Sequence, residues 1–400
     1  MRWLVAMGML FAQDTLRFMA YNLLKYGATP GYCNTACKDA QLRTIVSFVR
    51  PAVIGVNEVA PASLLIQRIL DSVLNINGVS YWRSSQYVNL SGSDIVNALF
   101  YDSRRLGWLK QELVTTQGGL RDIYAYHLYY KEPEPITDTL FLVVIVSHFK
   151  AGNSPSDMQT RTQAGTAIKQ YIQSLPAGRR RFVVEMGDHN LYSDAEGAYQ
   201  ALTAVLVDPG PAGPWSDNGN YALYHTQSTR TASLADGGIG GGLDDRFDFI
   251  FFSPECTTLT ARARYIPGSF RVLGQDGQRF NQAINSSPLP VGYPIGVINA
   301  LYAMSDHLPV VADFALSVMP YTTDVEKKDF IHNPYVYEIE GSSLYLTATD
   351  PTQIEVWTLR GELYTQIQLL PGYRQAITLP AGVYTLRSGT GHVKRVSLLP

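Results

Sequence analysis

Polar residues that could hold a metal ion or move protons occur where short apolar runs of this chain end. A fully buried strand has a continuous apolar run, and a polar residue at its end lies on the rim of the sheet. Five such clusters combine carboxylates, two histidines and an asparagine: Glu58; His148; Asp188 with Asn190; Asp248; and Asp306 with His307. Gathered on one rim, these groups would hold a divalent cation beside acid–base residues, as hydrolysis of a phosphate ester requires.

Strand and helix patterns alternate in the part of the chain that carries these clusters. Apolar, β-branched and aromatic content predicts strands at 16–24, 51–59, 81–88, 94–103, 124–131, 139–149, 182–188, 247–252 and 308–316. Apolar residues at helical spacing predict helices at 36–50, 61–74 and 157–175. This mixture predicts an α+β fold in which helices flank two packed sheets, a four-layer α/β/β/α sandwich. The glycine-dense segment 234–245 is either a simple flexible loop or a mobile loop over the site.

Composition limits the class of protein. The 400 residues are 46% apolar and only 16% charged, with a formal net charge of −2. A core of good size is therefore expected, without the strongly basic balance typical of nucleic-acid-binding proteins. Residues 1–13 have one positive charge before an apolar run, which predicts a short signal peptide cleaved near Ala12 or Gln13. No other segment approaches membrane-spanning length, so we expect a soluble, exported monomer.

The pattern changes after the last of these strands. Residues 317–335 are polar and aperiodic, as in a linker. Short alternating strands then recur about every ten residues over 336–400, which predicts a small all-β sandwich. The catalytic part would thus occupy 14–316.

The three cysteines cannot all pair within the chain. Cys33 and Cys37 could form a local disulfide in an oxidising compartment, whereas Cys256 would remain single. A lone pair at this spacing is a weak zinc signal, so we interpret it as structural or incidental.

The ordered motifs resemble the endonuclease/exonuclease/phosphatase superfamily, which has a DNase I-like fold. They are YNLL, the strand-end Glu58, SHFKAG, GDHN, RFDFI and MSDHLPV, and they span residues 15–316. The resemblance implies that Glu58 binds the cation and that Asn22 holds it or a phosphate oxygen, with Asp306 as a second metal or hydrogen-bonding acid. Hard oxygen ligands favour Mg²⁺, with Mn²⁺ or Ca²⁺ as alternatives.

The same resemblance assigns the remaining roles. His307 would act on the attacking water or the phosphate, and Asp248 would orient its imidazole. Asp188 and Asn190 would grip the phosphate or align the nucleophile, and His148 would serve as general acid or donor. Two further residues of the SHFKAGN loop, Lys150 and Asn153, could touch the substrate, although a solvated lysine is an equal alternative.

Two positions depart from the family pattern. Asn57 stands before the metal-binding glutamate, where glutamine is usual, and His189 stands in GDHN, where an aromatic residue is common. Neither change removes a catalytic group. His189 could either pack as an aromatic ring or add a hydrogen-bond donor.

The C-terminal segment resembles the sorting domain of proteins exported by the type IX secretion system. The matching residues are IEVWTLRGEL with Gly361, LPAGVYTLRSG with Gly382 and Tyr384, and VKRVSLL with Lys394. The resemblance implies a secreted or surface-attached protein that interacts with this secretion machinery. A general carbohydrate- or surface-binding β-domain is the alternative.

Together these features predict a secreted, Mg²⁺-dependent phosphodiesterase, nuclease-like and acting on DNA or RNA. A sphingomyelinase-like phospholipase is the first alternative, and it would show an exposed aromatic hairpin such as the run 124–130. A phosphomonoesterase is the second. A catalytically idle surface-binding protein would be a different class, but such a relative would usually have lost at least one site residue.

Overall fold

The computed structural model describes ten stretches of the chain, namely residues 13–28, 31–131, 139–258, 261–317, 335–340, 343–348, 352–358, 362–370, 374–389 and 393–398. The predicted signal peptide, apart from Gln13, and the predicted linker, apart from its two end residues, lie outside them. Two compact units are formed, one by residues 1–106, 111–127 and 142–318 and the other by 107–110, 128–141 and 319–400.

A seven-stranded sheet is built from both ends of the predicted catalytic part. Its order is β10-β12-β1-β2-β4-β3, and β11 also pairs with β12. The bounds are β1 Gln13–Tyr26, β2 Val53–Val59, β3 Trp82–Ser84, β4 Val96–Asp102, β10 Ala263–Tyr265, β11 Arg271–Val272 and β12 Val310–Ser317. β1 runs parallel to β2 and antiparallel to β12. Continuous apolar runs make β1 and β2 the buried centre of this sheet.

A second sheet of five strands has the order β5-β6-β7-β8-β9. Its members are β5 Leu106–Thr115, β6 Ile123–Tyr130, β7 Phe141–His148, β8 Val183–Asp188 and β9 Asp248–Phe252. All residues of β7, β8 and β9 are buried. β7 and β8 are parallel, and β9 is antiparallel to β8.

The two sheets pack face to face through apolar side chains. Phe182 packs against Phe18 and Phe314 of the first sheet, with ring centroids 6.0 and 5.3 Å away. At Gly55 of β2, an added Cβ would lie 2.8 Å from the side chain of Met186 on β8. The absence of a side chain at Gly55 therefore leaves room for Met186 between the sheets.

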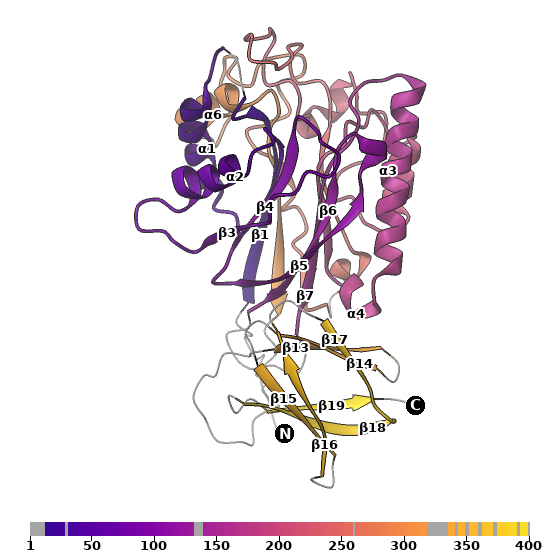
Figure 1. Cartoon of the computed structure of the whole chain (residues 1–400). Coiled ribbons are helices and arrows are strands. Elements are labelled where there is room, and N and C mark those ends of the chain that lie inside the picture. The colour runs from indigo at the N-terminus through magenta and orange to yellow at the C-terminus, as the bar shows by residue number, and fades with distance from the viewer. Residues whose placement is uncertain are drawn as a thin grey trace, which may run out of the picture. The chain divides into compact units, whose positions relative to one another are not determined.

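Helices cover the outer faces of both sheets (Figure 1). α1 (Thr35–Val49), α2 (Ser63–Ile69) and α6 (Ile295–Met304) lie beside the first sheet, and α3 (Pro155–Ser174) lies beside the second. The short helices α4 and α5 span Ala177–Arg180 and Gly197–Thr203, and α5 packs against α3. α3 starts with a capping box between Ser154 and Asp157. The fold is thus the predicted four-layer sandwich.

The C-terminal strands form a small β-sandwich, as predicted. One sheet has the order β13-β14-β17 and the other β16-β15-β18-β19. The strands are β13 Tyr335–Glu340, β14 Ser343–Ala348, β15 Thr352–Thr358, β16 Leu363–Leu369, β17 Arg374–Thr378, β18 Gly382–Ser388 and β19 Val393–Leu398. Alternating side chains of both sheets form one apolar core, for example Leu344, Leu346, Ile354, Val356 and Leu386.

Six of the strands and α-helices within residues 14–316 were not predicted, namely β5, β10, β11, α4, α5 and α6. Sequence patterns did not predict β5, because its residues after Leu109 are only partly buried or exposed and its apolar pattern is weak. The aromatic run 124–130 is the buried strand β6 rather than an exposed hairpin. No helix in the described stretches is both long and apolar enough to cross a membrane.

Candidate active site

The strand register brings the predicted polar clusters to one edge of the sandwich. Asn22 of β1 is paired with Asn57 of β2, next to Glu58. In the second sheet His148 is opposite Asp188, which is opposite Asp248. Parallel pairing of β1 with β2 and of β7 with β8 places their carboxyl ends on the same side, so the side chains of both sheets converge there.

Local backbone geometry positions the carboxylates of Glu58 and Asp188. Glu58 has a φ of 58°, in the left-handed region, where the pairing of β2 with β4 is irregular. This irregularity frees Glu58 from the ladder. Before Asp188, Gly187 has a φ of 144°, and an added Cβ would lie 2.0 Å from the carbonyl oxygen of Ser147. Only glycine permits β8 to lie this close to β7 immediately before Asp188.

Glu58, His148 and Asp188 form a group that could hold a metal ion. Their ligand atoms all lie within 4.8 Å of one another. Nε2 of His148 is 3.4 Å from Oδ2 of Asp188 and 3.9 Å from Oε1 of Glu58. Burial raises the pKa of Asp188 to about 6 and lowers the pKa of His148 well below its ordinary value. A neutral imidazole between two carboxylates fits a divalent cation, whose charge would compensate the buried carboxylates.

Asn22 lies between these carboxylates but presents its nitrogen to them. Nδ2 donates to Oε1 of Glu58 at 3.1 Å and to Oδ2 of Asp188 at 3.0 Å. Its oxygen accepts a hydrogen bond from the backbone of Leu24 at 2.9 Å. In this arrangement Asn22 holds the carboxylates in position, and its amide would have to turn before its oxygen could bind a metal.

The segment after Asn22 is held by a buried lysine. Nζ of Lys38, in α1, donates to the carbonyl oxygens of Leu23, Leu24 and Met304 at 2.7, 2.6 and 2.9 Å. Burial lowers the pKa of Lys38 to about 7. The three carbonyl acceptors satisfy all of its donors, so the end of β1 is tied to α1 and to the end of α6.

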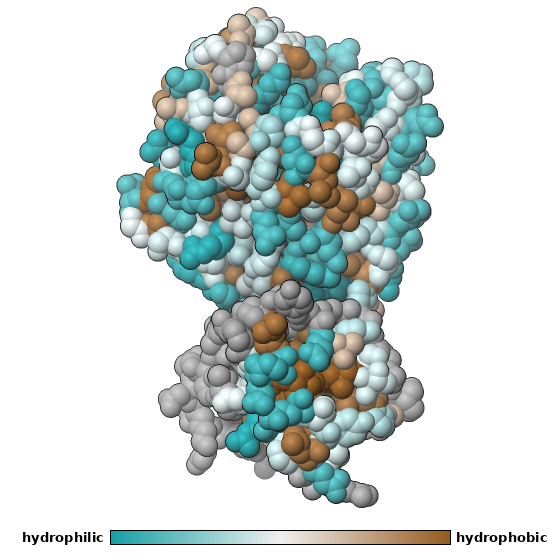
Figure 2. All heavy atoms as spheres, in the orientation of Figure 1, coloured by the Kyte–Doolittle hydropathy of each residue, from teal (hydrophilic) through white to brown (hydrophobic). Residues whose placement is uncertain are grey.

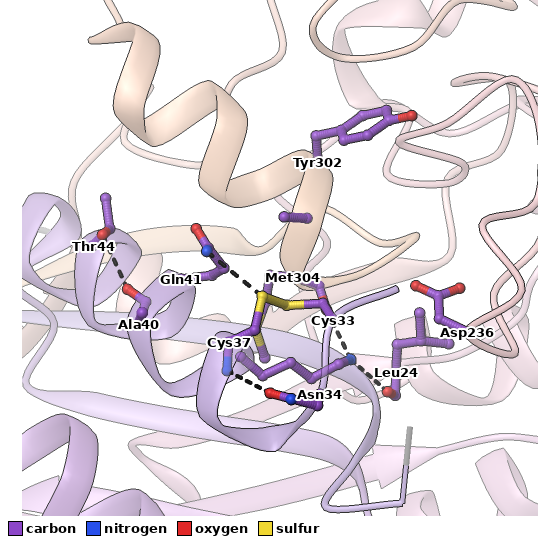
Figure 3. Close-up of a disulfide and its surroundings, with 12 residues drawn as sticks. Leu24, Cys33, Asn34, Cys37, Ala40, Gln41, Thr44, Asp236, Tyr302 and Met304 are labelled. Carbon is purple, nitrogen blue, oxygen red and sulfur yellow. Dashed lines mark hydrogen bonds between the residues drawn. A yellow bond between two sulfur atoms is a disulfide. The ribbon is translucent and has the colours of Figure 1, made fainter. Parts of the chain in front are cut away.

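A disulfide stands at the start of the same helix. Cys33 and Cys37 form the local bond that the sequence allowed, and Asn34 caps α1 by accepting a hydrogen bond from the Cys37 backbone (Figure 3). Leu24 and Met304, which receive the Lys38 hydrogen bonds, lie beside this disulfide (Figure 3). Cys256 is buried and unpaired, as expected.

Asp248 and His307 form a carboxylate–imidazole pair opposite the metal-binding group. Oδ2 of Asp248 is 2.7 Å from Nδ1 of His307, and the hydroxyl of Thr226 accepts from the Asp248 backbone at 3.2 Å. Nε2 of His307 faces Oδ2 of Asp188 at 3.6 Å. Burial opposes the charge on His307, but Asp248 and Asp188 raise its pKa well above the ordinary value. The pair can therefore accept and hold a proton at Nε2.

Asp306 contacts Gln227 and the glycine-dense segment. Its Oδ2 accepts from the backbone of Ile239 at 2.9 Å and from Nε2 of Gln227 at 3.4 Å. It is not part of the group formed by Glu58, His148 and Asp188. The hydrogen bond from Ile239 anchors the glycine-dense segment to the site edge, so that segment does adjoin the site.

Asn190 completes the turn after β8. Its backbone, with a φ of 48°, donates to Oδ1 of Asp188 at 3.0 Å. Its Nδ2 donates to the carbonyl of Phe149 at 3.3 Å, and the residue is 6% exposed. Asp188 and Asn190 are therefore neighbours on the rim, as their spacing predicted.

His189 packs inward as an aromatic ring and also makes hydrogen bonds. Its ring lies edge-on to Phe149, Phe249 and Phe251 at centroid distances of 4.8, 5.4 and 5.4 Å. Nε2 is 2.7 Å from a carboxylate oxygen of Glu185, and Nδ1 is 3.0 Å from the Gly187 carbonyl. Both alternatives left open by the sequence therefore apply, and the donor faces the core rather than the substrate.

The two predicted substrate contacts on the loop before α3 lie among exposed residues. The ammonium of Lys150 is 2.9 Å from Asp157 and donates to the Ala151 carbonyl at 2.7 Å. Asn153 is exposed on the same loop. Among the residues that the structure describes, neither is hydrogen-bonded or ion-paired to Glu58, Asp188 or His307, so their contact with substrate stays a prediction.

Sequence reasoning missed two residues at the site and understated a third. Arg121 donates to the Phe149 carbonyl at 2.8 Å, and burial lowers its pKa although the charges of Asp188 and Glu58 raise it. Gln227 contacts His307. Asn57, noted only as a departure, donates to Ser147 and accepts from the Asp188 backbone at 2.9 and 3.0 Å. Arg121 and Gln227 lie outside apolar runs, so strand-end patterns could not find them.

Comparison with solved structures finds endonuclease/exonuclease/phosphatase proteins. A D. rerio TDP2 complexed with a single-strand DNA product is 16% identical with a TM-score of 0.47, covering 75% of this chain and 99% of that one. A family protein from Bacteroides thetaiotaomicron is 13% identical with a TM-score of 0.45, covering 77% and 97%. One from Beutenbergia cavernae is 15% identical with a TM-score of 0.45, covering 96% and 100%. No family model matches the sequence, and no curated protein matches it.

Proposed function

We propose that this protein is a metal-dependent phosphoester hydrolase, and more specifically a secreted, nuclease-like phosphodiesterase that uses Mg²⁺. The observation that carries this proposal is the convergence of two functional groups. The candidate metal ligand Asp188 lies 3.6 Å from Nε2 of His307, which is itself held by Asp248. A cation site beside an oriented imidazole is suited to in-line attack of water on a phosphate.

Each residue has a distinct part in the proposed reaction. Glu58 and Asp188 would hold the cation, with His148 as a third ligand or a donor to the phosphate. The bound cation would neutralise phosphate charge and polarise the phosphorus centre. His307 would take the proton of the attacking water at Nε2, while Asp248 keeps the imidazole oriented. Asn190 would align the phosphate.

Arg121 adds a positive charge at the same edge. One of its guanidinium nitrogens is fixed on the Phe149 carbonyl, one residue after His148. Its electrostatic partners include Asp188 and Glu58. A guanidinium with remaining donors is suited to bind a phosphate oxygen. This charge supports an anionic ester as substrate despite the near-neutral charge of the whole chain.

A nucleic acid is the proposed substrate because an exported hydrolase with this site would meet DNA and RNA as phosphodiesters. Export and sorting through residues 336–400 are part of the proposal. The support for sorting is the sequence of 354–363 and 379–399, whose described parts include residues of β15, β16, β18 and β19. Secretion machinery would then be a partner of the second unit, and the protein would act as a monomer.

A phospholipase is less well supported than a nuclease. The aromatic strand β6 is almost entirely buried, so it cannot serve as a membrane-contacting hairpin. On the face shown in Figure 2, hydrophobic residues of the first unit are interspersed with hydrophilic ones. A phosphomonoesterase remains the second candidate, because the same cation and imidazole would also act on a terminal phosphate.

Hydrolysis assays separate these candidates. Bis-p-nitrophenyl phosphate, p-nitrophenyl phosphate, plasmid DNA and sphingomyelin would be tested with Mg²⁺, Mn²⁺ or EDTA. Metal-dependent cleavage of DNA and of the diester, lost in His307→Ala, is expected. Turnover of sphingomyelin alone would support the phospholipase, and turnover of the monoester alone would support the phosphomonoesterase. Failure on all four with every metal would leave a surface-binding protein as the better account.

A further inference from the structure

We propose that Gln227 is a further substrate-contacting residue, whose carboxamide donates to a phosphate oxygen beside His307. The inference rests on the proposed function, since it assigns a residue to that same phosphate site. Nε2 of Gln227 lies 2.6 Å from Nε2 of His307 and 3.4 Å from Oδ2 of Asp306. The amide is thus directed at the nitrogen that would take the proton of the attacking water.

The backbone around Gln227 fixes it in this place. Its carbonyl accepts from the backbones of Asp244 and Asp245 at 2.9 and 3.0 Å, and its own N–H donates to the Asp245 carbonyl at 3.1 Å. It also forms a bridge with His307 itself. Only 8% of the residue is exposed. Because two other segments of the chain, at Asp244 with Asp245 and at His307, hold its backbone and the residue is buried, the side chain has little freedom to leave the site.

The hydrogen bond to His307 cannot persist while that nitrogen reacts. A hydrogen bond between these two nitrogens can form only while Nε2 of His307 carries no proton, with the imidazole proton on Nδ1, facing Asp248. During the reaction, the attacking water must hydrogen-bond to the lone pair of this Nε2, or a phosphate oxygen must occupy the space in front of it. Once displaced, the buried amide of Gln227 needs another acceptor, since Asp306 at 3.4 Å offers only a long contact.

A phosphate oxygen is the acceptor that the reaction supplies at this point. Nε2 of His307 faces Asp188 across 3.6 Å, so a phosphate held by the metal-binding group would lie against both His307 and Gln227. A carboxamide carries both a donor and an acceptor, so it can also turn its oxygen to a protonated Nε2 after proton transfer. Gln227 would therefore serve the imidazole before the reaction and the phosphate during it.

Gln227→Met tests this directly, because methionine has a similar length and no strong donor. Steady-state kinetics on bis-p-nitrophenyl phosphate and inhibition by inorganic phosphate would be measured in the full chain. The variant is expected to lower kcat/KM and to raise the inhibition constant of phosphate, each by about ten- to a hundredfold. Gln67→Met, which removes an exposed amide bonded only to Asp71, is the matched control and should match the wild type.

The outcomes separate this inference from the proposed function. If the wild type itself hydrolyses no phosphoester, the proposed function fails. If the wild type is active and Gln227→Met has unchanged kcat/KM and unchanged phosphate inhibition, Gln227 only fills space and the inference is wrong. Faster turnover in the variant would also overturn it, because Gln227 would then block His307 rather than bind substrate. Thermal unfolding of each variant shows whether a loss of activity reflects a loss of fold.

Discussion

The Glu185–His189 pair beneath the site offers a double-mutant test of how the GDHN turn is held. Both side chains are 0% exposed, and the imidazole contacts both carboxylate oxygens, at 2.7 and 2.9 Å. Replacing one partner leaves the other polar and buried without its main contact. Breaking a fully buried pair costs about 3–5 kcal/mol. His189→Phe and Glu185→Leu should each lower the free energy of unfolding by this amount.

The double variant should recover most of this loss. Phenylalanine fits a ring site already formed by Phe149, Phe249 and Phe251, and an apolar pair of similar volume is often neutral or stabilising relative to a buried ion pair. Thermal unfolding is the assay, and each single variant should melt roughly 6–10 °C below the wild type. The coupling energy of the cycle should therefore be large.

Two results would refute this reasoning. If His189→Phe has the same melting temperature as the wild type, the contact with Glu185 contributes nothing to stability and the imidazole acts only as an aromatic ring. If the double variant is no more stable than the worse single variant, the two residues are not energetically coupled. Folding of each variant would be verified by circular dichroism before melting.

Three further predictions concern the same edge of the sheets. Arg121→Met should lower kcat/KM for phosphoesters by about ten- to a hundredfold, because a charged donor is lost from the phosphate; unchanged kinetics would remove Arg121 from the site. Asn57→Leu should lower the free energy of unfolding by about 2–4 kcal/mol, because the backbone groups of Ser147 and Asp188 lose their hydrogen bonds to Asn57. Chemical denaturation measures this, and a loss below about 1 kcal/mol would contradict the prediction. Glu185 raises the pKa of His189 against the effect of burial, so the folded state binds more protons than the unfolded one. The stability that this protonation contributes is complete below about pH 6.5 and is lost as pH rises through the raised pKa. Chemical denaturation across this pH range should show a smaller loss of unfolding free energy in the Glu185→Leu/His189→Phe variant than in the wild type.

The ends of the strands could be predicted from the sequence because a strand that is buried on both faces has a continuous apolar sequence. Asp188 and Asp248 could be placed on the rim for this reason, and the register confirms that they lie opposite each other. Gln227 and Arg121 sit outside such runs, and only the folding of distant segments brings them to the site.

Side-chain orientation was also beyond the sequence. Asn22 was predicted beside the cation, and it does adjoin Glu58, but hydrogen bonding to Leu24 decides which end of its amide faces the carboxylates. The inward direction of His189 likewise depends on Glu185, which lies four residues earlier on β8. Such choices are made by local hydrogen bonds that residue spacing does not specify.

The central claim is that a cation at Glu58 and Asp188 and the imidazole of His307 act together on one phosphate. Hydrolysis of bis-p-nitrophenyl phosphate across a Mg²⁺ titration tests it most directly, comparing the wild type with Glu58→Gln and His307→Ala. The account predicts metal-dependent activity in the wild type, a higher Mg²⁺ requirement in Glu58→Gln, and loss of turnover without a change in Mg²⁺ affinity in His307→Ala. Activity that persists in EDTA, or that survives His307→Ala at the wild-type rate, would contradict it.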